Sequence, residues 1–428
     1  MPRFCADSLN RVLALLLAAM AWGVVHPAAT PSDTGTRIFN DRFRTLKVST
    51  AGSFMDVPVI RLGTDDRIVI SFDELGDDVS YLQYRLLHCN ADWRPSQLLE
   101  SEYLAGFNVA GVTDYGFSEN TFIHYVNYRI EIPNDDMQPL MPGNYLLQVF
   151  PEMEEDDVIL QARFSITSNE VRVNGGVSTT TDRGRNMDWQ QLSFNVDTGD
   201  FSARDPFSEF IVTIEQNGDP HSMRVLTHPM RLDGRTLVYE HLNELLFDAG
   251  NEFRRFETLQ TTYPGMGADS VRYIGNLYHS FLRHDQPRRN KEYAYDQTQF
   301  GRFMVRELNA TDSDLGADYV MVHFTLEAPE YMGADVYLDG EFTHHRLDDM
   351  YKMHYDIETR SYGAVVPLKQ GSYNYRYVVV PRGTGRPDNS VDGNKYETRN
   401  EYTVKVFHRA PEARGDELVG FARMYSFQ

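Results

Sequence analysis

Cysteine is almost absent from this sequence. Cys5 and Cys89 are the only two in 428 residues, and Cys5 lies in an N-terminal segment that we expect to be removed. A chain left with one cysteine cannot form an internal disulfide bond. The folded protein must therefore depend on its hydrophobic cores, and 41% hydrophobic and 12% aromatic residues are typical of globular proteins.

An excess of basic residues is also missing. The chain has 41 Lys and Arg against 62 Asp and Glu, which gives a formal net charge of −21. Nucleic acids and anionic membrane surfaces both select basic protein surfaces. We therefore expect no nucleic-acid partner. An acidic surface of this kind favours solubility or a basic protein partner.

Long hydrophobic runs are missing after the N-terminus. Residues 12–25 form one apolar run, preceded by Arg3 and Arg11 and followed by the small Ala28 and Ala29. The run is shorter than the roughly 20 residues that span a bilayer, so it is typical of a secretory signal. We expect a signal peptide over residues 1–29, with an uncleaved anchor as the alternative. Export without disulfides indicates a bacterial envelope location.

Catalytic and metal-binding motifs are missing too. The sequence has no HExxH and no GxSxG. The stretch His88–Ser96 combines His88 with Cys89, but neighbouring strand residues point to opposite faces and make a poor nucleophile–base pair. We expect it to be the end of a strand and its turn. Weak metal or calcium candidates are His344, His345, Asp348, Asp349 and His354, and the acidic turn 388–393. We predict no catalytic residues, no cofactor and no metal.

The pattern that dominates is alternation of apolar and polar residues with a period of two. Strands of this kind, separated by Gly, Pro, Asn and Asp, predict an all-β fold of antiparallel sandwiches with little helix. The expected strands are 67–72, 81–89, 144–150, 209–219 with an Asn-Gly turn, 319–328, 372–380 and 401–407. Residues 96–104 are expected to form a short helix, and 237–247 fit helix and strand equally well.

Three consecutive β-sandwich blocks are expected after the signal peptide. An N-terminal immunoglobulin-like block covers residues 36–170, and a middle β block covers residues 171–310. A C-terminal block similar to early-set domains covers residues 311–428, after the polar stretch 309–317.

Aromatic residues are concentrated in residues 102–128, around three glycines. Tyr and Phe are enriched where proteins contact each other, although such residues also build cores. From this stretch we predict that Tyr103, Phe107, Tyr115 and Phe117 bind a partner. The acidic run 151–157 is expected to be a solvated hairpin loop or a docking surface for a basic partner.

Two segments resemble known modules. Tyr84-Arg85-Leu86, Trp93 and Pro142–Tyr145 are similar to the periplasmic immunoglobulin-like module of two-component sensors. Residues 334–380 are similar to early-set domains that accompany glycan-active enzymes. Those modules bind sugar through surface tryptophans, and this region contains none.

The chain as a whole, from about residue 36 to 428, resembles a Bacteroidetes family of exported proteins associated with the plug of the type IX secretion translocon. The resemblance is collinear and is carried by residues 39–48, 58–75, 88–107, 128–135, 250–257, 317–326 and 392–409. It implies a non-enzymatic periplasmic protein that seals the outer-membrane translocon β-barrel when the barrel carries no cargo. It implies no membrane span of its own, and we expect a monomer when free.

Two other functions remain open at this point. A carbohydrate-binding or enzyme-associated early-set module would rest on the last block alone. A sensor-like or cargo-chaperone module would bind secreted cargo in place of the barrel.

Overall fold

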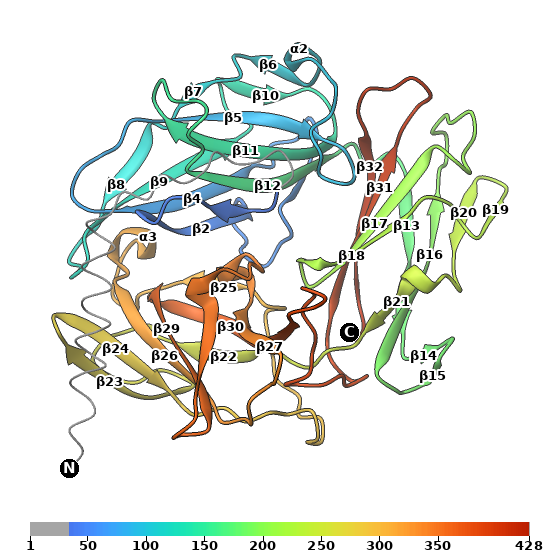
Figure 1. Cartoon of the computed structure of the whole chain (residues 1–428). Coiled ribbons are helices and arrows are strands. Elements are labelled where there is room, and N and C mark those ends of the chain that lie inside the picture. Colours follow the sequence, from blue (N-terminus) through green and yellow to red (C-terminus); the bar gives the residue numbers. More distant parts are fainter. Residues whose placement is uncertain (1–33, 428) are drawn as a thin grey trace.

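A computed structural model describes residues 34–427, so the expected signal peptide at residues 1–29 lies outside the described residues. Strands account for 48% of the structure and helices for 4%. The prediction of an all-β fold with little helix is therefore confirmed. Figure 1 shows three units that meet at the centre of the molecule.

The first sandwich spans residues 37–167 and contains two sheets. One sheet has the order β1 (Arg37–Ile38), β12 (Leu160–Thr167), β11 (Gly143–Pro151), β5 (Leu82–Cys89) and β7 (Ala110–Gly111), with β3 (Val59–Arg61) parallel to β12. The other has the order β2 (Phe43–Thr50), β4 (Ile68–Leu75), β9 (Tyr125–Ile132) and β8 (Asp114–Phe117). Alternate residues of both sheets meet between them, as the period of two requires. Phe72 and Tyr128 from one sheet and Leu86 and Leu147 from the other belong to this core.

The second sandwich combines residues 172–248 with the C-terminal residues 401–425. Its first sheet has the order β13 (Arg172–Ser178), β16 (Trp189–Asp197), β20 (Thr236–Tyr239) and β19 (Arg231–Asp233), with β21 (Leu246–Asp248) also pairing with β16. Its second sheet has the order β18 (Asp219–Leu226), β17 (Phe210–Gln216), β31 (Glu401–His408) and β32 (Glu417–Tyr425). The expected Asn-Gly turn joins β17 to β18, with Asn217 at φ 54° and Gly218 at φ 69°. Glycine has no Cβ and adopts such angles without strain.

The strand pairing departs from the expected boundaries near residue 310. The strands β31 and β32 lie beyond residue 311, yet β31 pairs with β17 of the second sandwich and β32 pairs with β31. Conversely, residues 254–305 contribute strands to the third unit. The third unit is thus inserted into the second sandwich, whose last two strands follow it. In Figure 1 the red β31–β32 hairpin stands among the green strands of the second sandwich.

The third unit spans residues 254–381 and is built on one continuous nine-stranded sheet. The order is β22 (Arg254–Glu257), β30 (Gly371–Pro381), β27 (Ala334–Asp339), β28 (Lys352–Asp356), β29 (Ser361–Lys369), β26 (Tyr319–Leu326), β24 (Leu277–Leu282) and β23 (Ala268–Ile274), with β25 (Phe303–Val305) on β30. Strand β28 changes partner along its length, because Lys352 and Met353 pair with β27 whereas His354–Asp356 pair with β29. The sheet therefore folds over at β28 and encloses its own core.

The remaining elements are short. They are α2 (Glu100–Tyr103), β6 (Leu104–Gly106), β10 (Met137–Pro139), β14 (Thr180–Thr181), β15 (Gly184–Arg185), η1 (Asn243–Leu245), α3 (Ser313–Gly316), η2 (Glu341–Thr343) and η3 (Asp349–Tyr351). The expected helix over 96–104 is confined to α2, where the Glu102 side chain accepts a hydrogen bond from the Leu99 backbone at 2.6 Å. The ambiguous segment 237–247 is mostly strand, with η1 between β20 and β21.

Candidate functional site

The stretch His88–Ser96 does not form a reactive pair. The Cys89 side chain packs with Trp93 and Leu146, while the His88 ring meets Tyr145 edge-on at a centroid distance of 5.3 Å. Burial raises the pKa of the Cys89 thiol to about 12, so it is a thiol and not a thiolate at neutral pH. The strand end and turn that the sequence predicts are what the structure contains.

The same turn joins the first sandwich to the second. The Ala91 backbone donates to Asp416 Oδ2 at 2.9 Å, and the Asp416 backbone donates to Asn90 Oδ1 at 3.2 Å. Asp416 is buried and also accepts from Arg409 at 2.7 Å. The polar residues that made this stretch resemble a reactive site thus hold two units together.

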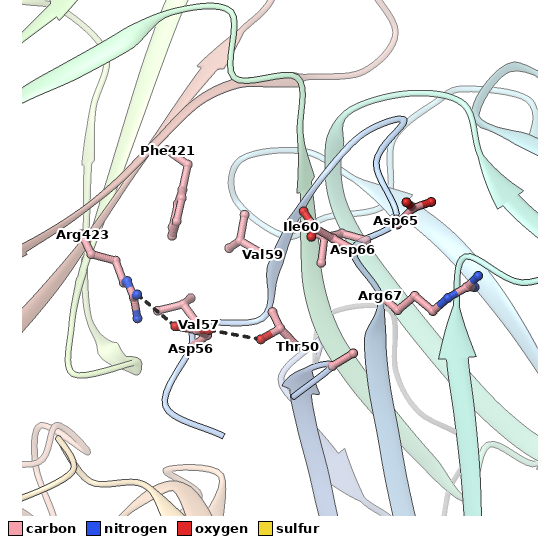
Figure 2. A pocket seen from close by; sticks show the side chains of 11 residues that line it. Thr50, Asp56, Val57, Val59, Ile60, Asp65, Asp66, Arg67, Phe421 and Arg423 are labelled. Atoms are coloured by element: carbon pink, nitrogen blue, oxygen red, sulfur yellow. Dashed lines mark hydrogen bonds and ion pairs between the residues drawn. The ribbon is translucent and has the colours of Figure 1, made fainter. Parts of the chain in front are cut away.

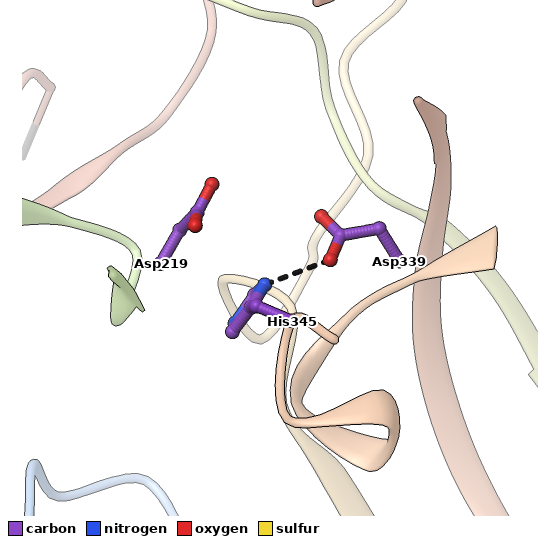
Figure 3. A group of neighbouring side chains, drawn as sticks. All are labelled: Asp219, Asp339 and His345. Atoms are coloured by element: carbon purple, nitrogen blue, oxygen red, sulfur yellow. Dashed lines mark hydrogen bonds and ion pairs between the residues drawn. The ribbon is translucent and has the colours of Figure 1, made fainter. Parts of the chain in front are cut away.

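A cluster of two carboxylates and a histidine lies between the second sandwich and the third unit (Figure 3). Ligand atoms of Asp219, Asp339 and His345 all lie within 4.8 Å of one another. Arg376 already occupies this cluster, because its guanidinium donates to Asp339 Oδ2 at 2.7 Å and to Asp219 Oδ2 at 2.5 Å. Burial alone would raise the pKa of Asp339, but Arg376 and His345 outweigh burial and hold it well below its usual value. A metal ion would have to displace Arg376, so the cluster is a closed ion network.

The other metal candidates from the sequence are not brought together. Burial lowers the pKa of His344 to about 3, and His354 is an exposed residue of β28. In the turn 388–393, Asp392 is buried and pairs with Arg254 at 2.7 Å and Arg288 at 3.0 Å. That carboxylate is therefore committed to two arginines and does not face a calcium loop.

Tyr103 does not fit the predicted partner-binding role. It is 3% exposed, belongs to the core of the first sandwich and donates its hydroxyl hydrogen to Leu86 O at 3.1 Å. Tyr103 is the last residue of the short helix α2, which directs the ring inward. The sequence could not distinguish this direction, because the period of two stops at residue 89.

The other three predicted residues are exposed. Phe107 is 86% exposed, Tyr115 46% and Phe117 52%. Tyr115 and Phe117 lie on the edge strand β8 with ring centroids 6.3 Å apart. Within residues 34–427, no ring contact connects Phe107 to either of them. The structure therefore brings together two of the four predicted residues.

Strand β8 lies at the seam between the first sandwich and the third unit, and more aromatic residues follow this seam. Leu315 of α3 lies against Gly116, between Tyr115 and Phe117. Phe122 from the next loop contacts Tyr273 and Tyr278 of the β23–β24 hairpin, with centroids 5.7 Å and 5.1 Å apart. We call Tyr115, Phe117, Phe122, Tyr273 and Tyr278 the seam surface. Sequence reasoning missed Tyr273 and Tyr278, because they are about 150 residues away from β8 in the chain.

Two of the hollows in the described part of the chain lie where the units meet. The larger is a cleft of about 710 Å³ lined by residues of all three units. The smaller, of about 390 Å³, lies between the first sandwich and β32 (Figure 2). In the smaller hollow Asp56 forms an ion pair with Arg423 at 2.9 Å.

Comparison with known families identifies the first sandwich. Residues 43–168 match the family model described as type 9 secretion system plug protein, first domain. The chain belongs to the type IX secretion plug family. This plug-family membership suggests a role other than catalysis. The finding confirms the family that the sequence resembles.

Solved structures extend the likeness of this plug-family chain beyond its first sandwich. A crystal structure of a hypothetical protein from Parabacteroides merdae ATCC 43184 is 37% identical, with a TM-score of 0.90 over 92% of this chain and 99% of that chain. A DNA-bound alkylpurine DNA glycosylase, AlkC from Pseudomonas fluorescens, is 12% identical over 29% of this chain and 30% of its own. Its TM-score of 0.16 is too low to indicate a shared fold. No curated protein matches the chain. Within residues 34–427, no helix has the length and apolar character needed to cross a membrane.

Proposed function

We propose that this protein is a periplasmic plug that sterically seals the outer-membrane translocon barrel of type IX secretion when the barrel carries no cargo. The match of residues 43–168 to the plug family is the observation on which the proposal rests. Membership of the family supports a role in type IX secretion, and the sealing step and its partner are what we propose beyond it.

Rigidity supports a steric role. The joint between the first sandwich and the third unit contains a buried ion pair, in which Lys369 Nζ lies 2.7 Å from Asp73 Oδ2. The closed network at Arg376 joins the second sandwich to the third unit in the same way. Buried charges strongly disfavour separation, because each would lose its partner. The three units therefore present one large solid body, as a stopper requires.

A contact surface supports the choice of a protein partner. Exposed aromatic residues gather on the seam surface, and rings of this kind dominate protein interfaces. Phe107 remains a separate candidate contact on the first sandwich. We expect the seam surface to face the barrel, and the work it performs needs no catalysis.

The test is capture of partners from envelope extracts. The wild-type protein is expected to recover a very large outer-membrane β-barrel subunit. A triple variant with Tyr115→Ser, Phe117→Ser and Phe122→Ser should capture at least about tenfold less of the barrel subunit. The reason is that the binding energy of an interface is concentrated in a few aromatic residues. The matched control changes three exposed apolar residues of the second sandwich, Met187→Ser, Phe207→Ser and Met230→Ser, and should behave as wild type.

Permeability of the outer membrane gives a second readout. A deletion strain is expected to admit large hydrophilic antibiotics that the parent excludes, and the wild-type gene should restore exclusion. Failure of the wild-type protein to recover a barrel, together with unchanged permeability in the deletion strain, contradicts the proposal. Recovery of secreted cargo without the barrel would favour a chaperone role.

A further inference from the structure

The central cleft carries a charge balance opposite to that of the whole protein. Seven of its lining side chains are Lys or Arg and five are Asp or Glu. The whole chain has 41 Lys and Arg against 62 Asp and Glu. A basic hollow in an acidic protein concentrates the field on an anion that enters it.

Most of the lining cations already have an ion pair. Lys47 pairs with Asp314, Arg94 with Asp92, Arg129 with Glu131, Arg302 with Glu401 and Arg346 with Asp348. Arg163 is also held within the chain, because its Nε donates to the Thr34 carbonyl oxygen at 2.6 Å, and it lies together with Lys405 at the ring of Trp93. The guanidinium carbon of Arg163 lies 4.4 Å from the ring centroid and the ammonium nitrogen of Lys405 lies 5.0 Å from it.

Lys405 differs from every other buried cation described for the cleft. Its residue is 6% exposed, and its ammonium group donates to Ser165 Oγ at 3.0 Å. No carboxylate within residues 34–427 forms an ion pair with it. Glu215 is close enough to favour its charged form but remains beyond ion-pair distance. Arg163, on the same ring, opposes that charged form.

Burial of an ammonium group without a counter-charge is costly, and native proteins compensate such groups. The face of Trp93 compensates in part, because an aromatic ring attracts cations. Ser165 gives the ammonium group one acceptor and no negative charge. Its hydroxyl oxygen accepts from Lys405, and its hydroxyl hydrogen is donated to Asn144 Oδ1 at 2.8 Å. The ammonium group therefore has unused donor capacity beside a cleft that is large enough for a ligand.

We propose that the central cleft binds a carboxylate ligand, whose carboxylate accepts hydrogen bonds from Lys405 beside the ring of Trp93. The volume of about 710 Å³ lies within the range of ligand sites, roughly 300–1,000 Å³. Apolar residues of the first sandwich, Phe54, Val57 and Pro58, line the same cleft and contact the remainder of the ligand. The carboxylate belongs either to a free organic acid or to an acidic residue of a peptide segment. The inference does not depend on the plug role.

The test uses the purified protein and isothermal titration calorimetry with three ligands. They are glutarate, a capped pentapeptide with three acidic residues, and inorganic phosphate. Trp93 fluorescence in a Trp189→Phe background locates the bound ligand at the cleft. Lys405→Met removes the ammonium group and keeps an unbranched side chain. The control is Lys291→Met, which alters an exposed lysine whose ammonium group donates to Gln286 Oε1 at 3.2 Å.

Saturable binding of glutarate or the peptide, with a Kd below about 1 mM, is the expected result. Lys405→Met should weaken binding by at least about thirtyfold, since it removes one partner of a buried charged contact. Tighter binding of the peptide identifies a protein-borne carboxylate, and tighter binding of glutarate identifies a free acid. Absence of binding at about 10 mM, binding of phosphate alone, or equal affinity in Lys405→Met overturns the proposal.

Discussion

Two buried lysines lie at joints between units, and their surroundings differ in one respect. Lys369 lies between the third unit and the first sandwich, and its ammonium group is 2.7 Å from Asp73 Oδ2 and 2.7 Å from the Asp314 carbonyl. Lys405 lies between the second sandwich and the first, and its ammonium group contacts Ser165. Burial lowers the pKa of both groups, in Lys369 against the attraction of Asp73.

An aromatic ring accompanies both lysines, so the ring does not explain the difference. The ammonium nitrogen of Lys369 lies 3.9 Å from the centroid of Tyr125, and that of Lys405 lies 5.0 Å from the centroid of Trp93. The two joints differ in the carboxylate, because Asp73 pairs with Lys369 and no carboxylate of the described residues pairs with Lys405. Asp73 is itself fully served, by Lys369, by Tyr319 at 2.6 Å and by Asn127 at 2.7 Å. One joint is complete within the chain, whereas the other presents a cation to an accessible cleft.

The largest effect is expected at the complete joint. Lys369→Met leaves Asp73 buried without its cation, and breaking a buried ion pair in this way costs about 3–5 kcal/mol. We expect the free energy of unfolding in urea to fall by that amount, against a change within about 0.5 kcal/mol for exposed Lys291→Met. A loss below about 1 kcal/mol would show that the joint is not held by this pair. The double variant Lys369→Met with Asp73→Asn should recover part of the loss.

Acid acts on a different group, the half-buried His323 of the third unit. Burial and the neighbouring His279 lower the pKa of His323 to about 4. The unfolded histidine takes up a proton near pH 6.5, so stability is lost as pH falls from 6.5 towards 4. At pH 5 the loss from this group is about 2 kcal/mol.

The measurement is a series of urea unfolding curves between pH 7 and 4.5. His323→Phe should flatten the acid slope, whereas His124→Gln, which changes an exposed histidine, should leave it unchanged. If the wild-type slope persists in His323→Phe, another group controls acid stability.

At the joint that contains Lys405, the expected change in the free energy of unfolding has the opposite sign. Lys405→Met replaces a buried cation that has no carboxylate, and such replacements are often neutral or stabilising. We expect a gain of about 1 kcal/mol at pH 7. The lowered pKa means that the unfolded chain holds more protons below pH 10.5, so wild-type stability rises with pH there and the gain of the variant shrinks. A loss of stability in Lys405→Met would show that both lysines are structural.

The smallest effects are expected on exposed rings of the first sandwich. Phe107→Ala and Phe117→Ala should change the free energy of unfolding by no more than about 0.5 kcal/mol. Tyr103→Ala should cost about 3 kcal/mol or more, because it empties a core position. Calorimetric melting of the three variants decides the assignment. A large loss in Phe107→Ala would place that ring in a core and remove it from the candidate contacts.

Much of the local fold could be predicted from the sequence. The seven expected strands all occur, from β4 to β31, because alternation with a period of two is a local signal. In residues 401–407 this signal places Tyr402, Val404 and Val406 inside and assigns Lys405 to the opposite face. That face is buried as well, since the first sandwich covers it. In an alternating strand the polar residues normally face solvent. Strand β31 departs from this rule, because a different unit covers each of its two faces.

Pairing between distant strands could not be predicted. Strand β17 ends at Gln216 and its partner β31 begins at Glu401, with the whole third unit between them. Loop closure over such a distance leaves no local pattern. The central cleft and the seam surface both depend on these distant contacts, so Lys405 and Tyr273 could not be recognised as site residues. Phe117 could be recognised, because the aromatic residues around it are close together in the sequence.

The insertion of the third unit has a consequence for the order in which the protein is made. Residues 401–425 follow the whole third unit in the chain, so one edge of β17 stays unpaired until the third unit has been made. The turn at Ala91 likewise waits for Asp416, more than three hundred positions downstream. Completion of the first two sandwiches therefore depends on residues 401–425. A chain truncated before residue 401 would expose the unpaired edge of β17 and the turn at Ala91. Envelope proteases would recognise such a truncated chain before it bound a partner.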